Sequence, residues 1–122
     1  MKYSKLIWHP HLDINNSPMM DVNSEPLLVF DGSPTRAILH NDINMIIEDK
    51  EYLDEVLAEF ENVLSDKEEE GSYSGEMLIF FYNKETCEVS IGEDIIAYFR
   101  TKDMYDMLKS FREYRDNYYS QR

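Results

Sequence analysis

The sequence predicts an α+β fold, in which an antiparallel or mixed sheet of four to six strands carries a long central helix and a C-terminal helix packed on it. Apolar residues between positions 49 and 67 recur with the 3.6-residue period of an amphipathic helix. Residues 75–101 hold the densest apolar, aromatic and β-branched content, in short runs separated by polar turns. Because 122 residues suffice for one hydrophobic core, we expect residues 1–122 to form a single globular domain.

Two short strands are predicted near the N-terminus. The first covers residues 4–8, since Pro10 biases the residue before it toward extended geometry and closes the run. The second covers residues 27–30 and ends at the turn-forming residues 31–34. Between these strands, residues 13–25 are rich in Asn, Ser and Asp and are expected to form a long surface loop.

The next segment leads from these strands to the central helix. Residues 36–40 are expected to return as a strand. Residues 41–47 stay open between a helix and a buried strand, because Ile43, Ile46 and Ile47 suit either spacing.

The central helix is the clearest element and is predicted at residues 49–67. Its apolar stripe comprises Leu53, Val56, Leu57, Phe60, Val63 and Leu64. We expect this stripe to face the sheet, which makes Phe60 a core residue and leaves its neighbour Glu59 in solvent. Gly71 is expected to end the helix, with residues 72–75 as a loop.

A run of three strands is predicted next. Residues 77–82 form a near-continuous apolar run, which is typical of a strand buried on both faces. After a polar turn at 83–86, apolar and polar residues alternate over 87–91, which indicates a strand with one covered face. Residues 92–94 break the pattern, and residues 95–99 restart it as the next strand of a meander.

The C-terminal helix is expected to begin at Thr101, whose hydroxyl can cap it, with Asp103 in the first turn. Its apolar face comprises Met104, Met107, Leu108, Phe111, Tyr114 and Tyr118. Basic residues in its middle and late turns match the negative end of the helix dipole. We expect this helix to dock on the sheet of its own chain rather than to present its tyrosines to a partner.

Few residues suggest catalytic or metal chemistry. His9 and His11 form a His-x-His pair, but a metal site needs three or four ligands and only His40 could add another imidazole, so we expect no metal and no other cofactor. The single cysteine, Cys87, falls in a strand pattern and is expected to be a buried apolar side chain. The chain has no Gly-rich phosphate loop, nucleophile elbow or Cys-x-x-Cys motif. We therefore expect a protein that is not an enzyme.

The lengths of the apolar runs indicate in which cellular compartment the protein is expected. No run approaches the roughly 18 apolar residues that a membrane span requires. The first 13 residues have only three consecutive apolar residues, which is too few for the core of a signal peptide. These features predict a cytoplasmic protein.

Charge is the strongest global signal in the sequence. The chain has 25 acidic and 12 basic residues, and residues 48–70 alone contribute eleven of the acidic and two of the basic ones. A formal net charge of −13 disfavours direct binding of nucleic acid or an anionic membrane and favours fast, steered encounter with a basic protein. The candidate partner-binding residues are nine carboxylates of this segment: Glu51, Asp54, Glu55, Glu59, Glu61, Asp66, Glu68, Glu69 and Glu70.

A small, cysteine-poor, strongly acidic α+β domain with a glutamate-rich helix resembles the bacterial immunity proteins that neutralise nuclease toxins, in particular those of contact-dependent growth inhibition systems. The resemblance rests on the general character of the whole chain, and no family binding residue is carried over. It implies a non-enzymatic inhibitor that binds a basic toxin, of nuclease type, through its acidic surface.

Three questions stay open at this level. Binding could instead use the exposed edge of the hairpin sheet, by strand addition, or the turn at residues 82–88. The chain could also be an adaptor or scaffold domain that has no toxin partner. Its oligomeric state is open as well.

Overall fold

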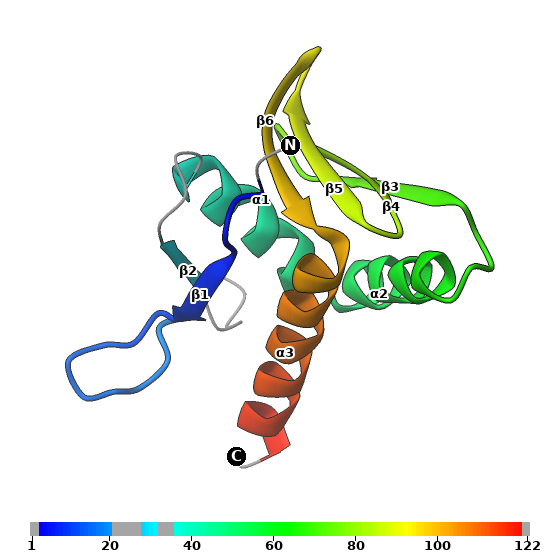
Figure 1. The fold of residues 1–122 in the computed structure, drawn as a ribbon. Helices are drawn as coiled ribbons and strands as arrows, with labels where there is room; N and C mark the ends of the chain where they lie inside the picture. The colour runs from blue at the N-terminus through cyan, green and yellow to red at the C-terminus, as the bar shows by residue number, and fades with distance from the viewer. Residues whose placement is uncertain (1–2, 21–27, 32–35, 121–122) are drawn as a thin grey trace.

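The computed structural model describes residues 3–20, 28–31 and 36–120 and confirms an α+β fold. Four antiparallel strands form one sheet in the order β3-β4-β5-β6, and two short strands form a separate pair. The helices lie together on one face of the four-stranded sheet, and among the described elements no helix covers the other face (Figure 1). The strands of this sheet are β3 (Glu70–Ser74), β4 (Ile79–Asn83), β5 (Thr86–Ile91) and β6 (Asp94–Arg100).

The separate pair consists of β1 (Ile7–Pro10) and β2 (Leu28–Asp31), which run antiparallel. β1 begins three residues later than predicted and runs through Pro10. Ser4, the predicted start, instead donates its backbone N–H to the carbonyl of Tyr98 in β6 at 2.7 Å. The predicted turn at residues 32–34 and the last part of the predicted loop, residues 21–25, lie outside the described residues.

Residues 36–48 form one helix, α1 (Arg36–Glu48), so the prediction of a strand at 36–40 is wrong. The buried apolar residues of α1 lie at positions i, i+4, i+7 and i+8, which is one helical face: Leu39, Ile43, Ile46 and Ile47. β-Branched isoleucines disfavour a helix only slightly. Burial of this apolar face against α2 and β2 outweighs the small cost of placing isoleucines in a helix.

The central helix is confirmed as α2 (Lys50–Leu64), which ends three residues before the predicted boundary. Asp49 is its N-cap, and its carboxylate accepts a hydrogen bond from the backbone N–H of Tyr52 at 3.1 Å. The predicted stripe faces the core, and its buried members are Leu53, Val56, Leu57, Phe60 and Val63.

β3 occupies the positions that were expected to end the helix and form a loop, so that prediction is also wrong. Its sequence, Glu-Gly-Ser-Tyr-Ser, contains one large apolar side chain, Tyr73, and therefore shows almost no alternation. Pairing with β4 creates the strand: Tyr73 lies opposite Phe80, and their rings stack at 4.4 Å.

The predicted meander is confirmed, with Gly92 at φ 57° in the turn between β5 and β6. The expectation that residues 77–82 are buried on both faces is wrong. Phe80 and Tyr82 are fully buried, but Ile79 and Phe81 point to the other side and are 45% and 42% exposed.

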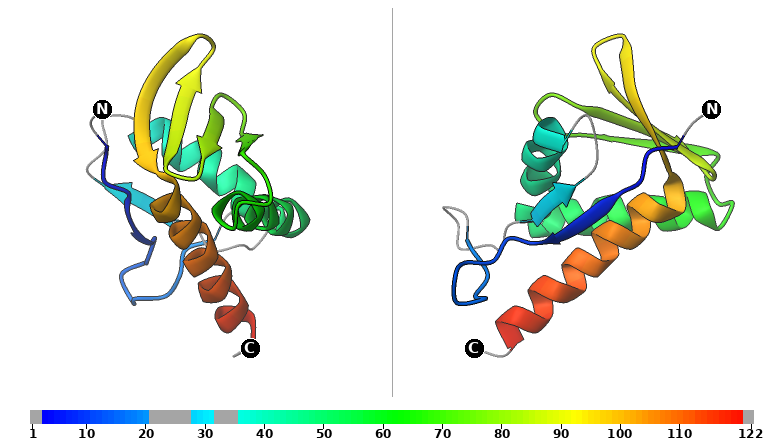
Figure 2. Two further views of the ribbon diagram at one scale, coloured as in Figure 1. Left: turned by 45° about the vertical axis from the view of Figure 1, so that its right-hand side comes forward. Right: turned by 60° about the vertical axis from the view of Figure 1, so that its left-hand side comes forward.

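The C-terminal helix is confirmed as α3 (Thr101–Ser120), which packs against α2, β5 and β6 (Figure 2). Its predicted face is buried at Met104, Met107, Leu108 and Phe111. Thr101 does not cap the helix: its hydroxyl donates to the carbonyl of Asn83 at 2.7 Å, and its backbone N–H donates to the carbonyl of Glu85 at 3.1 Å. These bonds join the start of α3 to the β4–β5 turn.

Candidate functional site

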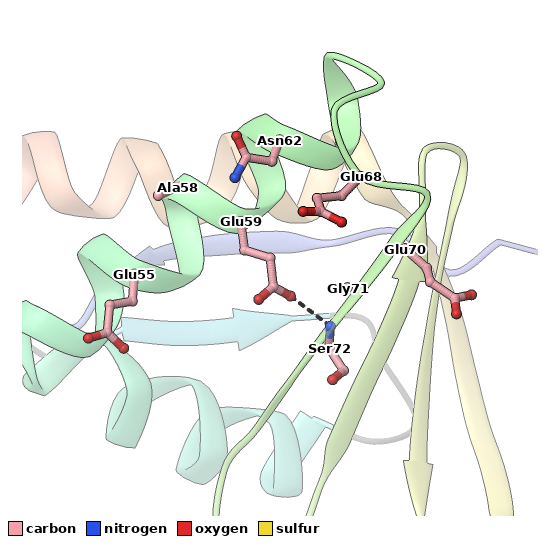
Figure 3. Close-up of a pocket in the computed structure, with 8 residues that line it drawn as sticks. All are labelled: Glu55, Ala58, Glu59, Asn62, Glu68, Glu70, Gly71 and Ser72. Carbon is pink, nitrogen blue, oxygen red and sulfur yellow. Dashed lines mark hydrogen bonds between the residues drawn. The ribbon is translucent and has the colours of Figure 1, made fainter.

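An open groove of about 550 Å³ lies between α2 and β3 (Figure 3). Four of its eight lining residues are glutamates, and none is basic. We call this feature the acidic groove. It is lined by Glu55, Ala58, Glu59 and Asn62 of α2, Glu68 of the α2–β3 connection, and Glu70, Gly71 and Ser72 of β3.

Glu59 links the two walls of the acidic groove. Its carboxylate accepts a hydrogen bond from the backbone N–H of Ser72 at 2.7 Å and another from the hydroxyl of Tyr82 at 3.0 Å. Burial of the Tyr82 phenol is the main cause that raises its pKa, and the hydrogen bond to Glu59 is the next. The hydroxyl therefore stays protonated and continues to donate its hydrogen bond to Glu59. Glu59 is thus a half-buried structural residue, which corrects the expectation that it lies in solvent.

Gly71 makes this arrangement possible. A Cβ atom on Gly71 would lie 2.6 Å from the hydroxyl oxygen of Tyr82 and would also overlap the carboxylate of Glu59. The absence of a side chain therefore allows α2 to approach β3 closely enough for the two hydrogen bonds to form.

Glu59→Ala is expected to lower the free energy of unfolding by about 1–3 kcal/mol, because it leaves the Tyr82 hydroxyl and the Ser72 N–H without an acceptor. Glu59→Gln keeps an acceptor oxygen and should cost less than Glu59→Ala. Urea denaturation of both variants, with the exposed Glu55→Ala as the control on the same helix, measures the difference. Equal midpoints for Glu59→Ala and Glu55→Ala would contradict a structural role for Glu59.

The same contacts cover the free edge of the sheet at β3. Besides the Ser72 N–H, the backbone N–H of Ser74 donates to the hydroxyl of Tyr52 at 3.2 Å, and this hydroxyl donates to the Ser74 carbonyl at 3.1 Å. At the opposite edge, the N–H of Ser4 occupies the carbonyl of Tyr98. The sequence leaves open whether a partner binds by strand addition. Such a partner would find backbone N–H and C=O groups at these positions that already make hydrogen bonds.

The structure divides the nine predicted carboxylates among three surroundings. One group lines the acidic groove: Glu55, Glu59, Glu68 and Glu70. A second group contacts other side chains of the chain: Asp54, Glu61 and Asp66. A third group is exposed outside the groove lining: Glu51 and Glu69.

Two members of the second group, Asp54 and Asp66, are paired with basic side chains and present less negative charge to a partner. Asp54 pairs with Arg112 of α3 at 3.2 Å, and Asp66 pairs with Lys84 of the β4–β5 turn at 2.7 Å. Exposed ion pairs of this kind stabilise a fold little, but each places a positive charge beside the negative one. Glu61 instead accepts a long hydrogen bond of 3.4 Å from a tyrosine hydroxyl of α3, which leaves its charge unmatched by this contact.

The groove carboxylates differ from this group. Within the residues that the structure describes, Glu55, Glu68 and Glu70 take part in no ion pair. Figure 3 shows the side chain of Glu68 directed back toward α2, while Glu70 points away from the groove at the end of β3. Three carboxylates that have no ion-pair partner among the described residues therefore lie along the acidic groove and its rim.

The other candidate residues lie elsewhere. His9 is on β1, where its Nδ1 donates to the carbonyl of Pro10 at 3.0 Å, and the described part of the chain contains no group of three His, Cys, Asp or Glu residues arranged to hold a metal. Cys87 is buried, as predicted, and its burial, with a smaller effect of Glu88, raises the thiol pKa to about 12. A thiol with this pKa is unsuited to act as a nucleophile at neutral pH.

Of the helices in the described ranges, none has the length and apolar character that a membrane span requires. The chain matches no protein-family model, no curated protein and no solved structure.

Proposed function

We propose that this protein is a cytoplasmic immunity protein of the contact-dependent growth inhibition type, a non-enzymatic inhibitor that binds a basic nuclease toxin directly. The observation that carries the proposal is the acidic groove. Its walls are held together by Glu59, and three of its carboxylates, those of Glu55, Glu68 and Glu70, have no ion-pair partner within the described residues.

A nuclease binds phosphate groups, so its active-site cleft carries lysine and arginine side chains. A cluster of carboxylates on a rigid support matches this cleft in charge, either by occupying it as a phosphate-like surface or by covering a site beside it. The described lining of the acidic groove offers glutamate, serine and asparagine but no histidine, cysteine or lysine, which supports charge recognition rather than catalysis.

Long-range attraction acts mainly on the encounter of two proteins. With a net charge of −13, the chain is expected to attract a basic partner at a rate that falls as salt rises, because the Debye length is only about 8 Å at physiological ionic strength. The association rate constant and its dependence on salt are therefore the quantities that test the proposal.

The test uses the protein encoded directly upstream, where a toxin gene is expected to precede its immunity gene. The purified product should be basic and should bind this chain. Glu55→Lys combined with Glu68→Lys should slow association by about tenfold at low salt and flatten its salt dependence. Stopped-flow measurement of binding across a salt series gives both quantities, and circular dichroism checks the fold.

Asp103→Lys combined with Glu113→Lys is the matched control, since both residues are exposed on α3 and the change in net charge is the same. This control should slow association much less. Equal slowing by the two double variants would mean that total charge, and not the acidic groove, governs encounter. If the upstream product neither binds nor is basic, the inhibitor proposal fails, and an adaptor or scaffold function takes its place.

A further inference from the structure

β4 carries large apolar side chains on both of its faces, although the structure covers only one of them. Phe80 and Tyr82 point into the core, while Ile79 and Phe81 point to the open face and are 45% and 42% exposed. An antiparallel sheet with one solvated face normally places polar residues at such outward positions. β4 departs from this pattern twice in five residues.

The neighbouring strands follow the usual pattern. Ser72 of β3 and Glu88 of β5 lie on either side of Phe81, and Ser74 and Ser90 lie on either side of Ile79. Beyond Ser90, the register places Ile95 of β6, which is 46% exposed. We call Ile79, Phe81 and Ile95 the outer sheet patch. Three large apolar side chains grouped on one open face differ from single exposed residues, which need no explanation, and mark an interaction surface.

The surroundings of the outer sheet patch are acidic. The sheet and its turns, residues 70–100, contain six acidic and two basic residues: Lys84 pairs with Asp66 outside the patch, and Arg100, at the end of β6, lies over the ring of Tyr3. Glu88 lies in register between Phe81 and Tyr98, at the middle of the face. A surface that covers this face must therefore be apolar at its centre and must carry positive charge around it.

A second copy of the chain does not meet this requirement. Pairing of two outer sheet patches would bring together two chains with a net charge of −13 each, and each copy would carry Glu88 into the interface. Charge repulsion of this kind opposes self-association and favours a basic protein as the partner.

We propose that the outer sheet patch is the apolar centre of the interface with a basic protein partner, whose complementary surface is an apolar area surrounded by lysine and arginine. This inference rests on the proposed function, because the same partner supplies the charge that matches the acidic groove. The two surfaces adjoin: Ser72 lines the groove and lies opposite Phe81 in the sheet, so one partner can cover both. The acidic groove then determines mainly the association rate constant, and the outer sheet patch determines mainly the dissociation rate constant.

The test measures dissociation of the complex with the purified upstream product. Ile79→Thr combined with Phe81→Thr removes apolar area while placing a strand-compatible, β-branched side chain at both positions. We expect the dissociation rate constant to rise at least about tenfold, with the association rate constant and its salt dependence unchanged. Ile95→Thr, at the end of the β5–β6 hairpin, gives a second variant that perturbs the rest of the sheet less and should act in the same direction.

Ile14→Thr is the matched control, because Ile14 is 97% exposed in the N-terminal loop, away from the sheet, and should leave dissociation unchanged. Folded patch variants that dissociate at the wild-type rate overturn the inference, even if the groove variants slow association as proposed. A dimer of the free chain in sedimentation equilibrium that the patch variants abolish also overturns it, because the occupant would then be a second copy. Failure of the wild-type chain to bind the upstream product overturns both proposals.

Discussion

Phe60→Ala is expected to lower the free energy of unfolding by about 3–5 kcal/mol, which is a large part of the total stability of a domain of this size. Phe60 is fully buried and lies where α2 meets the sheet. Its ring stacks on Tyr82 at 4.1 Å with an interplanar angle of 7° and contacts Tyr73 edge to face at 5.5 Å. Truncation removes these contacts and leaves a cavity that neighbouring β-strands cannot close without losing their register.

Urea denaturation followed by circular dichroism measures this effect, and Glu55→Ala is its control. Glu55 lies on the same helix, is exposed, and makes no ion pair within the described residues, so its replacement should change the free energy of unfolding by less than about 0.5 kcal/mol. Equally mild effects of the two substitutions would show that the apolar stripe of α2 does not face a core.

The elements that the sequence predicts well are those whose own side chains carry the signal. α2 has a stripe of apolar residues and an Asp N-cap, and β5 alternates regularly, so local pattern and tertiary structure agree. α1 lacks this agreement. Its isoleucines fit two periods equally well, and only their burial against α2 and β2 selects the helix.

β3 could not be predicted for a different reason. Glu70–Ser74 has the composition of a turn, and what makes it a strand is supplied by other segments: β4 pairs with it on one side, and Tyr52 and Glu59 of α2 bond its free N–H groups on the other. The sequence therefore places Glu55, Glu59, Glu68 and Glu70 among the candidate residues, but it does not predict that Gly71 and Ser72 join Glu70 in a strand that forms the second wall of the acidic groove.

The outer sheet patch has a sequence signal that can be interpreted in two ways. The apolar run at residues 77–82 predicts burial of both faces of the strand, and the structure buries only the face with Phe80 and Tyr82. An apolar run of this kind indicates that both faces of the strand are covered. It does not indicate whether the cover of the second face belongs to the same chain or to a partner.

Asp42→Ala is expected to lower the free energy of unfolding by about 3 kcal/mol or more, because hydrogen bonds from buried backbone donors to a charged acceptor contribute about 1.5–3 kcal/mol each. Asp42 of α1 is fully buried, and one of its carboxylate oxygens accepts both the N–H of Met77 at 2.9 Å and the N–H of Leu78 at 2.6 Å. Alanine would leave both donors at the β3–β4 turn without a partner. Denaturant midpoints measure the loss, and amide hydrogen exchange should accelerate at Met77 and Leu78.

Asp42→Asn separates the hydrogen bonds from the charge. Its single side-chain oxygen can occupy the position that accepts both N–H groups, so this variant should keep more stability than Asp42→Ala. Its amide nitrogen would then face the side-chain amide nitrogen of Asn41, which now donates to Asp42 at 3.2 Å, and the loss of that bond should still cost about 1 kcal/mol. Gly75→Ala tests the same contact from the other side, since a Cβ atom there would lie 2.6 Å from the accepting oxygen and would displace it. If Asp42→Ala and Gly75→Ala both retain the wild-type midpoint, α1 does not hold the β3–β4 turn through this carboxylate.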